Sequence, residues 1–120
     1  MPTSDLKIDP RELRHLGHLE KPDPETTGQG GGRRRRWIRY ASRVRARVEP
    51  LAGREFWQAQ GIEAQHTHKV KLRGIPGVTE SHRFVVASQY GEEMALNITA
   101  VIDVENRGRV LLLMCSGEAA

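Results

Sequence analysis

The segment WIRYASRVRARVE, residues 37–49, alternates between apolar and mainly basic side chains with a period of two. A β-strand turns successive side chains to opposite faces with this same period. One face carries Ile38, Tyr40, Val44, Ala46 and Val48, and the other carries Trp37, Arg39, Arg43, Arg45 and Arg47. The sequence therefore predicts a long strand that buries one face, presents a basic face on the other side and ends at Pro50.

Further short strands are predicted on both sides of this segment. Apolar patterns and intervening turn residues place them at residues 13–20, 66–73, 83–88, 96–105 and 110–115. In the strand at 96–105, the residues expected to share one face are Leu96, Ile98, Ile102 and Val104. Residues 52–60, which contain Phe56 and Trp57, are expected to form a short helix. The predicted fold is mainly β: a small antiparallel barrel or sandwich with one short helix in a long connection.

The chain is predicted to form a single domain. A loosely ordered leader is expected over residues 1–12, the β-barrel domain over residues 13–115, and a C-terminal tail over residues 116–120. Within the domain, residues 25–36 form a loop rich in glycine and arginine, whose composition predicts flexibility. The predicted helix belongs to a second connection, residues 49–65.

Composition and charge narrow the class of protein. The 120 residues carry a formal net charge of +4, which favours an anionic partner such as nucleic acid or an acidic protein surface. Cys115 is the single cysteine, so no intrachain disulfide can form, and its apolar neighbours predict a buried thiol. The polar N-terminal residues and the lack of a long apolar run predict neither a secretion signal nor a membrane span.

The sequence shows no pattern typical of a catalytic, cofactor-binding or metal-binding site. Motifs of nucleotide-binding loops, zinc proteases and serine hydrolases are missing. His66 and His68 share one face of the predicted strand at 66–73, as two metal ligands could. The single cysteine and the lack of a carboxylate at ligand spacing nevertheless disfavour zinc. Asp103 and Glu105 lie next to a predicted turn. Carboxylates there are expected to be solvated, and these two are not expected to act as an acid–base pair. The sequence thus predicts no enzyme, no cofactor and no metal.

The basic residues form the most informative pattern. Lys69, Lys71 and Arg73 share one face of the predicted strand at 66–73, just as arginines share one face of the strand at 37–49. If the two strands are neighbours, the sheet has a basic face. This face has two interpretations: an ordinary solvated surface, or a contact surface for an acidic partner subunit or for DNA. The run Arg33–Arg36 could neutralise phosphates, although few aromatic side chains accompany it.

Several motifs follow one another along the chain. They are Leu13-Arg14-His15, a glycine-rich loop before Trp37, Glu49-Pro50-Leu51-Ala52-Gly53-Arg54-Glu55-Phe56 followed by Ala59-Gln60, then His68–Arg73 and Leu96–Asp103. In their order and spacing, from about Leu13 to Cys115, the chain resembles the phage head-closure proteins, also called head–tail joining, stopper or connector proteins. The sequence departs from the family pattern at Ala52, where serine is commoner, in its arginine-rich loop, and at Gly17 in the first strand.

The resemblance implies a structural protein of a tailed bacteriophage. It implies a compact β-barrel subunit that assembles into a homo-oligomeric ring, expected to be twelve-fold at the portal vertex. The expected partners are the portal adaptor protein above, the tail tube or tail terminator protein below, and packaged double-stranded DNA in the channel, with no membrane. Such a ring retains the genome and docks the tail in the neck of the virion, after assembly in the host cytoplasm.

The resemblance also implies roles for two groups of residues. The connection after the long strand is expected to line or close the channel, or to join subunits, through Glu49, Arg54, Glu55, Phe56, Trp57 and Gln60. The basic residues expected near a partner or DNA are Arg33, Arg34, Arg35, Arg36, Arg43, Arg45 and Arg47. A ring needs two different contact patches on each subunit, and the acidic one is expected at Asp103, Glu105 and Glu55.

Two other functions remain open from the sequence. A tail-completion or tail-terminator protein of similar build would form its ring on the tail tube and not at the portal. A small basic nucleic-acid-binding barrel would bind free DNA tightly, and its affinity would fall steeply as the salt concentration rises.

Overall fold

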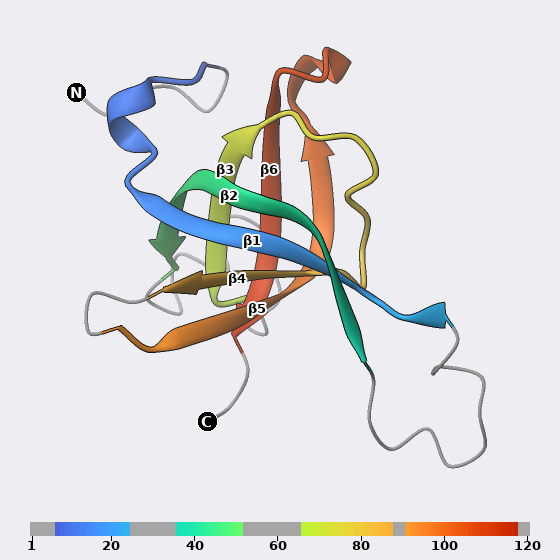
Figure 1. Cartoon of the computed structure of the whole chain (residues 1–120). Coiled ribbons are helices and arrows are strands. Elements are labelled where there is room, and N and C mark those ends of the chain that lie inside the picture. Colours follow the sequence, from blue (N-terminus) through green and yellow to red (C-terminus); the bar gives the residue numbers. More distant parts are fainter. Residues whose placement is uncertain (1–6, 25–35, 52–65, 88–90, 118–120) are drawn as a thin grey trace.

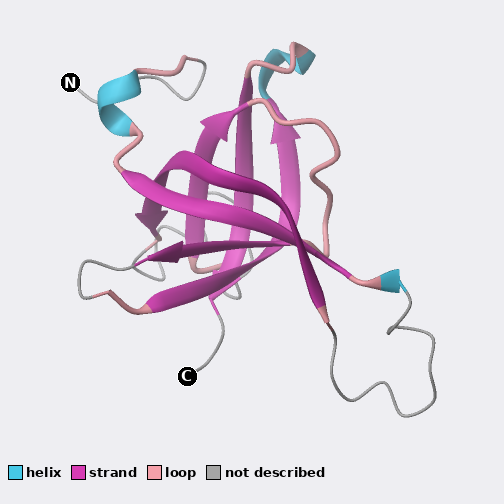
Figure 2. Cartoon of the chain, in the orientation of Figure 1, coloured by secondary structure: helices cyan, strands magenta, loops and turns pink. Residues whose placement is uncertain are grey.

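Six antiparallel strands close into a barrel in this computed structural model, which describes residues 7–24, 36–51, 66–87 and 91–117 (Figure 1). The strands are β1 (His15–Pro22), β2 (Trp37–Pro50), β3 (His68–Arg73), β4 (Arg83–Ala87), β5 (Glu93–Asp103) and β6 (Val110–Gly117). They follow the order β1-β2-β3-β6-β5-β4 around the barrel, with 3-10 turns η1 (Pro10–Glu12) and η2 (Val104–Asn106) outside it (Figure 2). The predicted mainly β fold is confirmed, as a barrel and not a sandwich. The predicted helix at residues 52–60 and most of the loop at residues 25–36 lie outside the described residues.

Two of the strands, β2 and β5, change neighbours along their length. β2 pairs with β1 along most of its length, but with β3 only from Ala46 to Pro50. Its first part and the end of β1 therefore form a two-stranded arm, which projects from the barrel at the lower right of Figure 1. β5 changes partner in a similar way, because residues 93–95 pair with β4 and residues 98–103 pair with β6.

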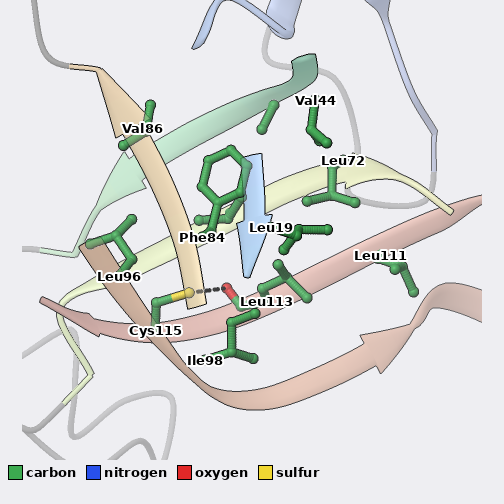
Figure 3. Close-up of a cluster of buried hydrophobic side chains, with 12 residues drawn as sticks. Leu19, Val44, Leu72, Phe84, Val86, Leu96, Ile98, Leu111, Leu113 and Cys115 are labelled. Carbon is green, nitrogen blue, oxygen red and sulfur yellow. Dashed lines mark hydrogen bonds between the residues drawn. The ribbon is translucent and has the colours of Figure 1, made fainter. Parts of the chain in front are cut away.

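Apolar side chains from all six strands fill the barrel. Figure 3 shows Phe84 in the middle of this core, with Leu19, Leu72 and Leu113 around it, and all four are fully buried. The Cys115 thiol also lies in the core and donates a hydrogen bond to the Leu113 carbonyl oxygen at 3.7 Å. Burial raises the pKa of Cys115 to about 12, so the thiol stays protonated and packs as a small apolar group. The predicted buried cysteine is confirmed.

Two bulges in β2 interrupt the alternation that the sequence suggested. Gly17 pairs with Val44 and Leu19 with Ala41, which leaves two β2 residues, Ser42 and Arg43, opposite one β1 residue. Arg43 adopts a left-handed backbone conformation with φ of 55°, as bulge residues often do. A second extra residue, at position 40, follows one step along the arm.

The predicted burial of Ile38 is wrong for a related reason. Ile38 is 40% exposed, because its part of β2 pairs with β1 in the arm, beyond the barrel core. The prediction assumed that one strand keeps one buried face along its whole length, which a strand that leaves the barrel does not do.

A third bulge, in β5, places Ile102 on the face opposite to the one it was expected to share with Leu96 and Ile98. Ile98 pairs with Cys115 and Ala100 with Met114, so Thr99 is an extra residue whose hydroxyl donates to the Met114 carbonyl oxygen at 2.9 Å. Beyond an extra residue every side chain moves to the other face. Val101 therefore packs against the core, while Ile102 is 47% exposed.

The segment before β1 lies against the outside of β2 and β3. The Glu12 carboxylate lies 3.4 Å from the Lys71 ammonium and 3.8 Å from the Arg47 guanidinium. Lys71 points out of the barrel yet is only 1% exposed. A buried ammonium requires a charged or hydrogen-bonding partner, and Glu12 is one such partner. Together with the buried Leu13, these ion pairs attach the residues around η1 to the barrel.

Candidate interaction surface

The sequence predicted two groups of contact residues, and the structure describes only some members of each group. Of the expected channel or inter-subunit segment, Glu49 lies in β2, whereas Arg54, Glu55, Phe56, Trp57 and Gln60 lie outside the described residues. Of the expected basic contact residues, Arg33, Arg34 and Arg35 lie outside them too, and Arg36 lies exposed next to β2. The remaining members, Arg43, Arg45 and Arg47, are on β2 itself.

The basic face expected from the sequence exists, but part of it is neutralised. β2 and β3 are neighbours, with Arg47 paired to Lys71 and Glu49 paired to Lys69 across the strands. The Glu49 carboxylate lies 3.6 Å from the Lys69 ammonium and 3.9 Å from the Arg47 guanidinium. Because Glu12 also contacts Arg47 and Lys71, this side of the barrel carries alternating charges and not a uniform positive one.

The positive charge that remains outward lies on the part of β2 that pairs with β1. Arg39, Arg43 and Arg45 are all exposed there. They form no ion pair with any residue in the described part of the chain. Arginines in this state bind anionic groups of another molecule without first breaking an internal contact.

A depression of about 270 Å³ lies beside these arginines, on the outer surface of the sheet formed by β2, β1, β4 and β5. Its apolar lining includes Leu16, Val85 and Ala87. Arg39 and Arg43 border it on the β2 side and Glu93 borders it on the β5 side. Leu16 is 41% exposed, which leaves an apolar surface between a basic and an acidic edge.

A polar cluster stands next to this depression and joins β1, β2 and β4. Glu20 accepts a hydrogen bond of 2.6 Å from Arg83 and one of 2.8 Å from His18, and the Arg83 guanidinium lies over the Trp37 ring at 4.2 Å. Burial alone would raise the pKa of Glu20, but the bonds from Arg83 and His18 outweigh it and lower the pKa below its usual value. The cluster therefore holds a carboxylate anion and fixes the base of the arm.

The Glu20→Gln substitution is expected to lower the free energy of unfolding at pH 7 by about 1–2 kcal/mol, because two charge-assisted hydrogen bonds weaken. The lowered pKa of Glu20 adds stability that is present above about pH 4.3 and is lost as the pH falls through the folded-state pKa. Urea unfolding from pH 7 down to acid should therefore show a flatter pH dependence for the variant.

The matched control is Glu80→Gln, since Glu80 is an exposed carboxylate in the connection between β3 and β4. Its effect on the free energy of unfolding at pH 7 should stay below about 0.5 kcal/mol. Equal pH slopes for the Glu20 variant and the original protein would show that this cluster does not stabilise the fold.

A second contact links the arm to the residues before β4. The Tyr40 hydroxyl and His82 Nδ1 share a hydrogen bond of 2.8 Å, and the two rings meet edge to face with centroids 5.2 Å apart. Burial raises the pKa of Tyr40 to about 12. Burial and the nearby charge of Lys21 lower the pKa of His82, which favours the neutral ring. The extra residue of the β2 bulge thus ties the arm to the connection before β4.

The sequence did not predict these contacts, because the two residues of each pair lie far apart in the chain. Glu20 and Arg83 are separated by 63 positions, and the partner of Lys71 is 59 positions away. Only the pairing of β1 with β4, and the return of the N-terminal segment over β3, bring them together. The position of Glu93 opposite the arginines also depends on the strand order.

Two searches of the described residues gave negative results. They contain no group of three or more histidine, cysteine, aspartate or glutamate side chains placed to hold a metal ion. Among the same residues, no helix has the length and apolar character needed to cross a membrane.

Comparison with families of known proteins identifies a family for this chain. The sequence profile of a family described as phage head completion protein matches residues 8–118, which include all six strands. No curated protein matches the sequence of this chain.

Proposed function

This chain belongs to the phage head completion protein family and is a structural component of the phage head, and from that premise we propose that it closes the head after DNA packaging. In this proposal, copies of the chain form a ring below the portal and its adaptor, in the neck of the virion. The ring retains the packaged double-stranded DNA and provides the surface on which the tail docks. Assembly takes place in the host cytoplasm.

The observation that carries the proposal is the family match over residues 8–118, which covers the whole barrel and not one motif of it. The physical character of the barrel is compatible with a role that depends on shape. Its core is packed with apolar side chains, and the depression on its outer surface is bordered by charges of both signs. Such a surface suits contacts between protein subunits.

The connection between β2 and β3 is our candidate for the channel side of the ring or for a contact between subunits. Its two ends are held together, because the backbone N–H of Leu51 donates to the carbonyl oxygen of Thr67 at 2.8 Å. Glu49, next to this junction, is fixed by Arg47 and Lys69. The connection therefore leaves and re-enters the barrel at the same place, next to Leu51 and Thr67. Its candidate residues beyond Glu49 are Arg54, Glu55, Phe56, Trp57 and Gln60.

Deletion of this protein from its phage is expected to give heads that fill with DNA, then lose it, and carry no tails. Electron microscopy of lysates, together with nuclease protection of the packaged DNA, measures both effects. The physical reason is that packaged DNA pushes outward through any portal channel that nothing blocks. Supplying the protein from a plasmid should restore full, tailed particles, which is the control for the deletion itself.

Two other outcomes would replace this proposal. Stable full heads beside loose tails of abnormal length would place the protein at the end of the tail. Normal virions, combined with tight and salt-sensitive binding of the purified protein to free DNA, would instead support a nucleic-acid-binding barrel.

A further inference from the structure

On the side of the barrel that bears the outer depression, two strand segments pair with a neighbour on one side only, within the described part of the chain. The strand order on this side is β2-β1-β4-β5. Residues 37–45 of β2 pair with β1 alone, and residues 93–95 of β5 pair with β4 alone, within the described part of the chain. Open edges present backbone and side-chain groups to other molecules, so they are common places for protein contacts.

These two edges carry opposite charges. Arg43 and Arg45 are exposed on the β2 edge, and Glu92 and Glu93 are exposed at the β5 edge. None of the four forms an ion pair with another described residue. Of the acids expected from the sequence to serve as the second contact patch, Asp103 accepts a hydrogen bond of 2.8 Å from the Gly108 N–H, and Glu105 lies 3.6 Å from Arg107. Glu55 lies outside the described residues.

The charged residues at the two edges also stand in one row across the sheet. Arg45 pairs with Leu16, and Ala87 pairs with Glu93. The register of β1 and β4, in which Gly17 pairs with Val86, brings Leu16 beside Ala87. The row therefore reads basic, apolar, apolar, acidic. When two copies lie side by side in the same orientation, Arg45 of one copy faces Glu93 of the next.

We propose that the β2 edge of one copy docks against the β5 edge of the next copy, with Arg43 and Arg45 of the first copy facing Glu92 and Glu93 of the second. This inference rests on the proposed ring, and it identifies the contact that repeats around it. A contact between two different patches generates a ring when the rotation between copies closes. Charge complementarity fixes the register of the contact, and the exposed Leu16 adds apolar area beside it.

A charge swap tests the contact in the phage from which the protein has been deleted. Three variants are supplied from a plasmid: Arg45→Glu, Glu93→Arg, and both changes in one chain. Each single change places like charges at every subunit boundary and should lower the titre of infectious particles about 10-fold or more. The double change restores opposite charges at every boundary and should bring the titre back to within a few-fold of that of the unchanged protein.

Glu80→Arg and Arg109→Glu are matched controls, because both residues are exposed and neither belongs to the β2 or β5 edge. Both controls should leave the titre unchanged, and thermal unfolding of each purified variant checks that it is folded. A double variant as defective as the single variants would overturn the proposal. So would a loss with Arg45→Glu alone, because that pattern indicates DNA or an acidic partner protein.

The unchanged protein in the same experiment tests the proposed function separately. If it fails to restore titre and full heads, the head-closure role itself falls. If it restores both, while neither single charge reversal has an effect, head closure stands and only this contact falls.

Discussion

A Gly74→Ala protein is expected to lose about 3 kcal/mol or more of its free energy of unfolding, a large part of the stability of a small domain. A Cβ atom built on Gly74 would lie 1.7 Å from the carbonyl oxygen of Gly108 and 2.5 Å from its carbonyl carbon. Both are backbone atoms of the connection that leads into β6, and the Gly74 N–H donates to the Arg109 carbonyl oxygen at 3.0 Å. The variant cannot relieve this clash by moving a side chain, so β3 and β6 must separate locally.

Chemical denaturation of the purified variants measures this effect, with Gly77→Ala as the matched control. Gly77 lies in the turn after Gly74 and has φ of +86°, but no atom lies within 4 Å of the position that a Cβ atom would take there. Alanine at this position carries only the conformational cost of the left-handed region, about 1–2 kcal/mol. If the two variants unfold at the same denaturant concentration, the contact at Gly74 is not the cause of its effect.

A Phe84→Ala protein is expected to be destabilised by about 3–5 kcal/mol. The ring of Phe84 is fully buried at the centre of the barrel and packs under Gly17, whose Cβ would lie 2.6 Å from the ring edge. Removing the ring leaves a cavity that the strands of a closed barrel cannot collapse to fill, so both the transfer and the cavity contributions are lost. Thermal and urea unfolding monitored by circular dichroism measure the change.

Leu16→Ala is the control for this prediction, because Leu16 is a large apolar residue of the neighbouring strand β1 that is 41% exposed. Its removal should change the free energy of unfolding by less than about 1 kcal/mol. A similar loss for both variants would mean that Phe84 is not the centre of the core.

The period-two patterns were enough to predict the approximate positions of the strands. The predicted strand at 37–49 is β2, and the one at 110–115 lies within β6, where side chains of both faces are largely buried. The burial of Ile38 was predicted wrongly, and so was the face of β5 on which Ile102 lies. Ile38 lies in an arm beyond the core, and Ile102 lies after a bulge. Neither the arm nor the bulge is visible in the local alternation of side chains on which the prediction was based.

The candidate contact surface was predictable only in part. The arginines of β2 were visible as one face of a strand, and the sequence also suggested that they could be a contact patch. The neutralisation of Arg47 by Glu12 and Glu49 depends on how the N-terminal segment returns over the barrel, which no local pattern records. The alignment of Arg45 with an acidic edge on the opposite side of the sheet depends on the strand order of a closed barrel.

The bulges in β2 have a consequence for the state of the protein before assembly. A regular open strand is a template on which further chains can add without limit. The extra residues at positions 40 and 42–43 break the even spacing of hydrogen-bonding groups along that edge. The edge therefore resists fibril growth. In the proposed ring, the number of copies that associate is left to side-chain charges and to the surface on which the ring forms.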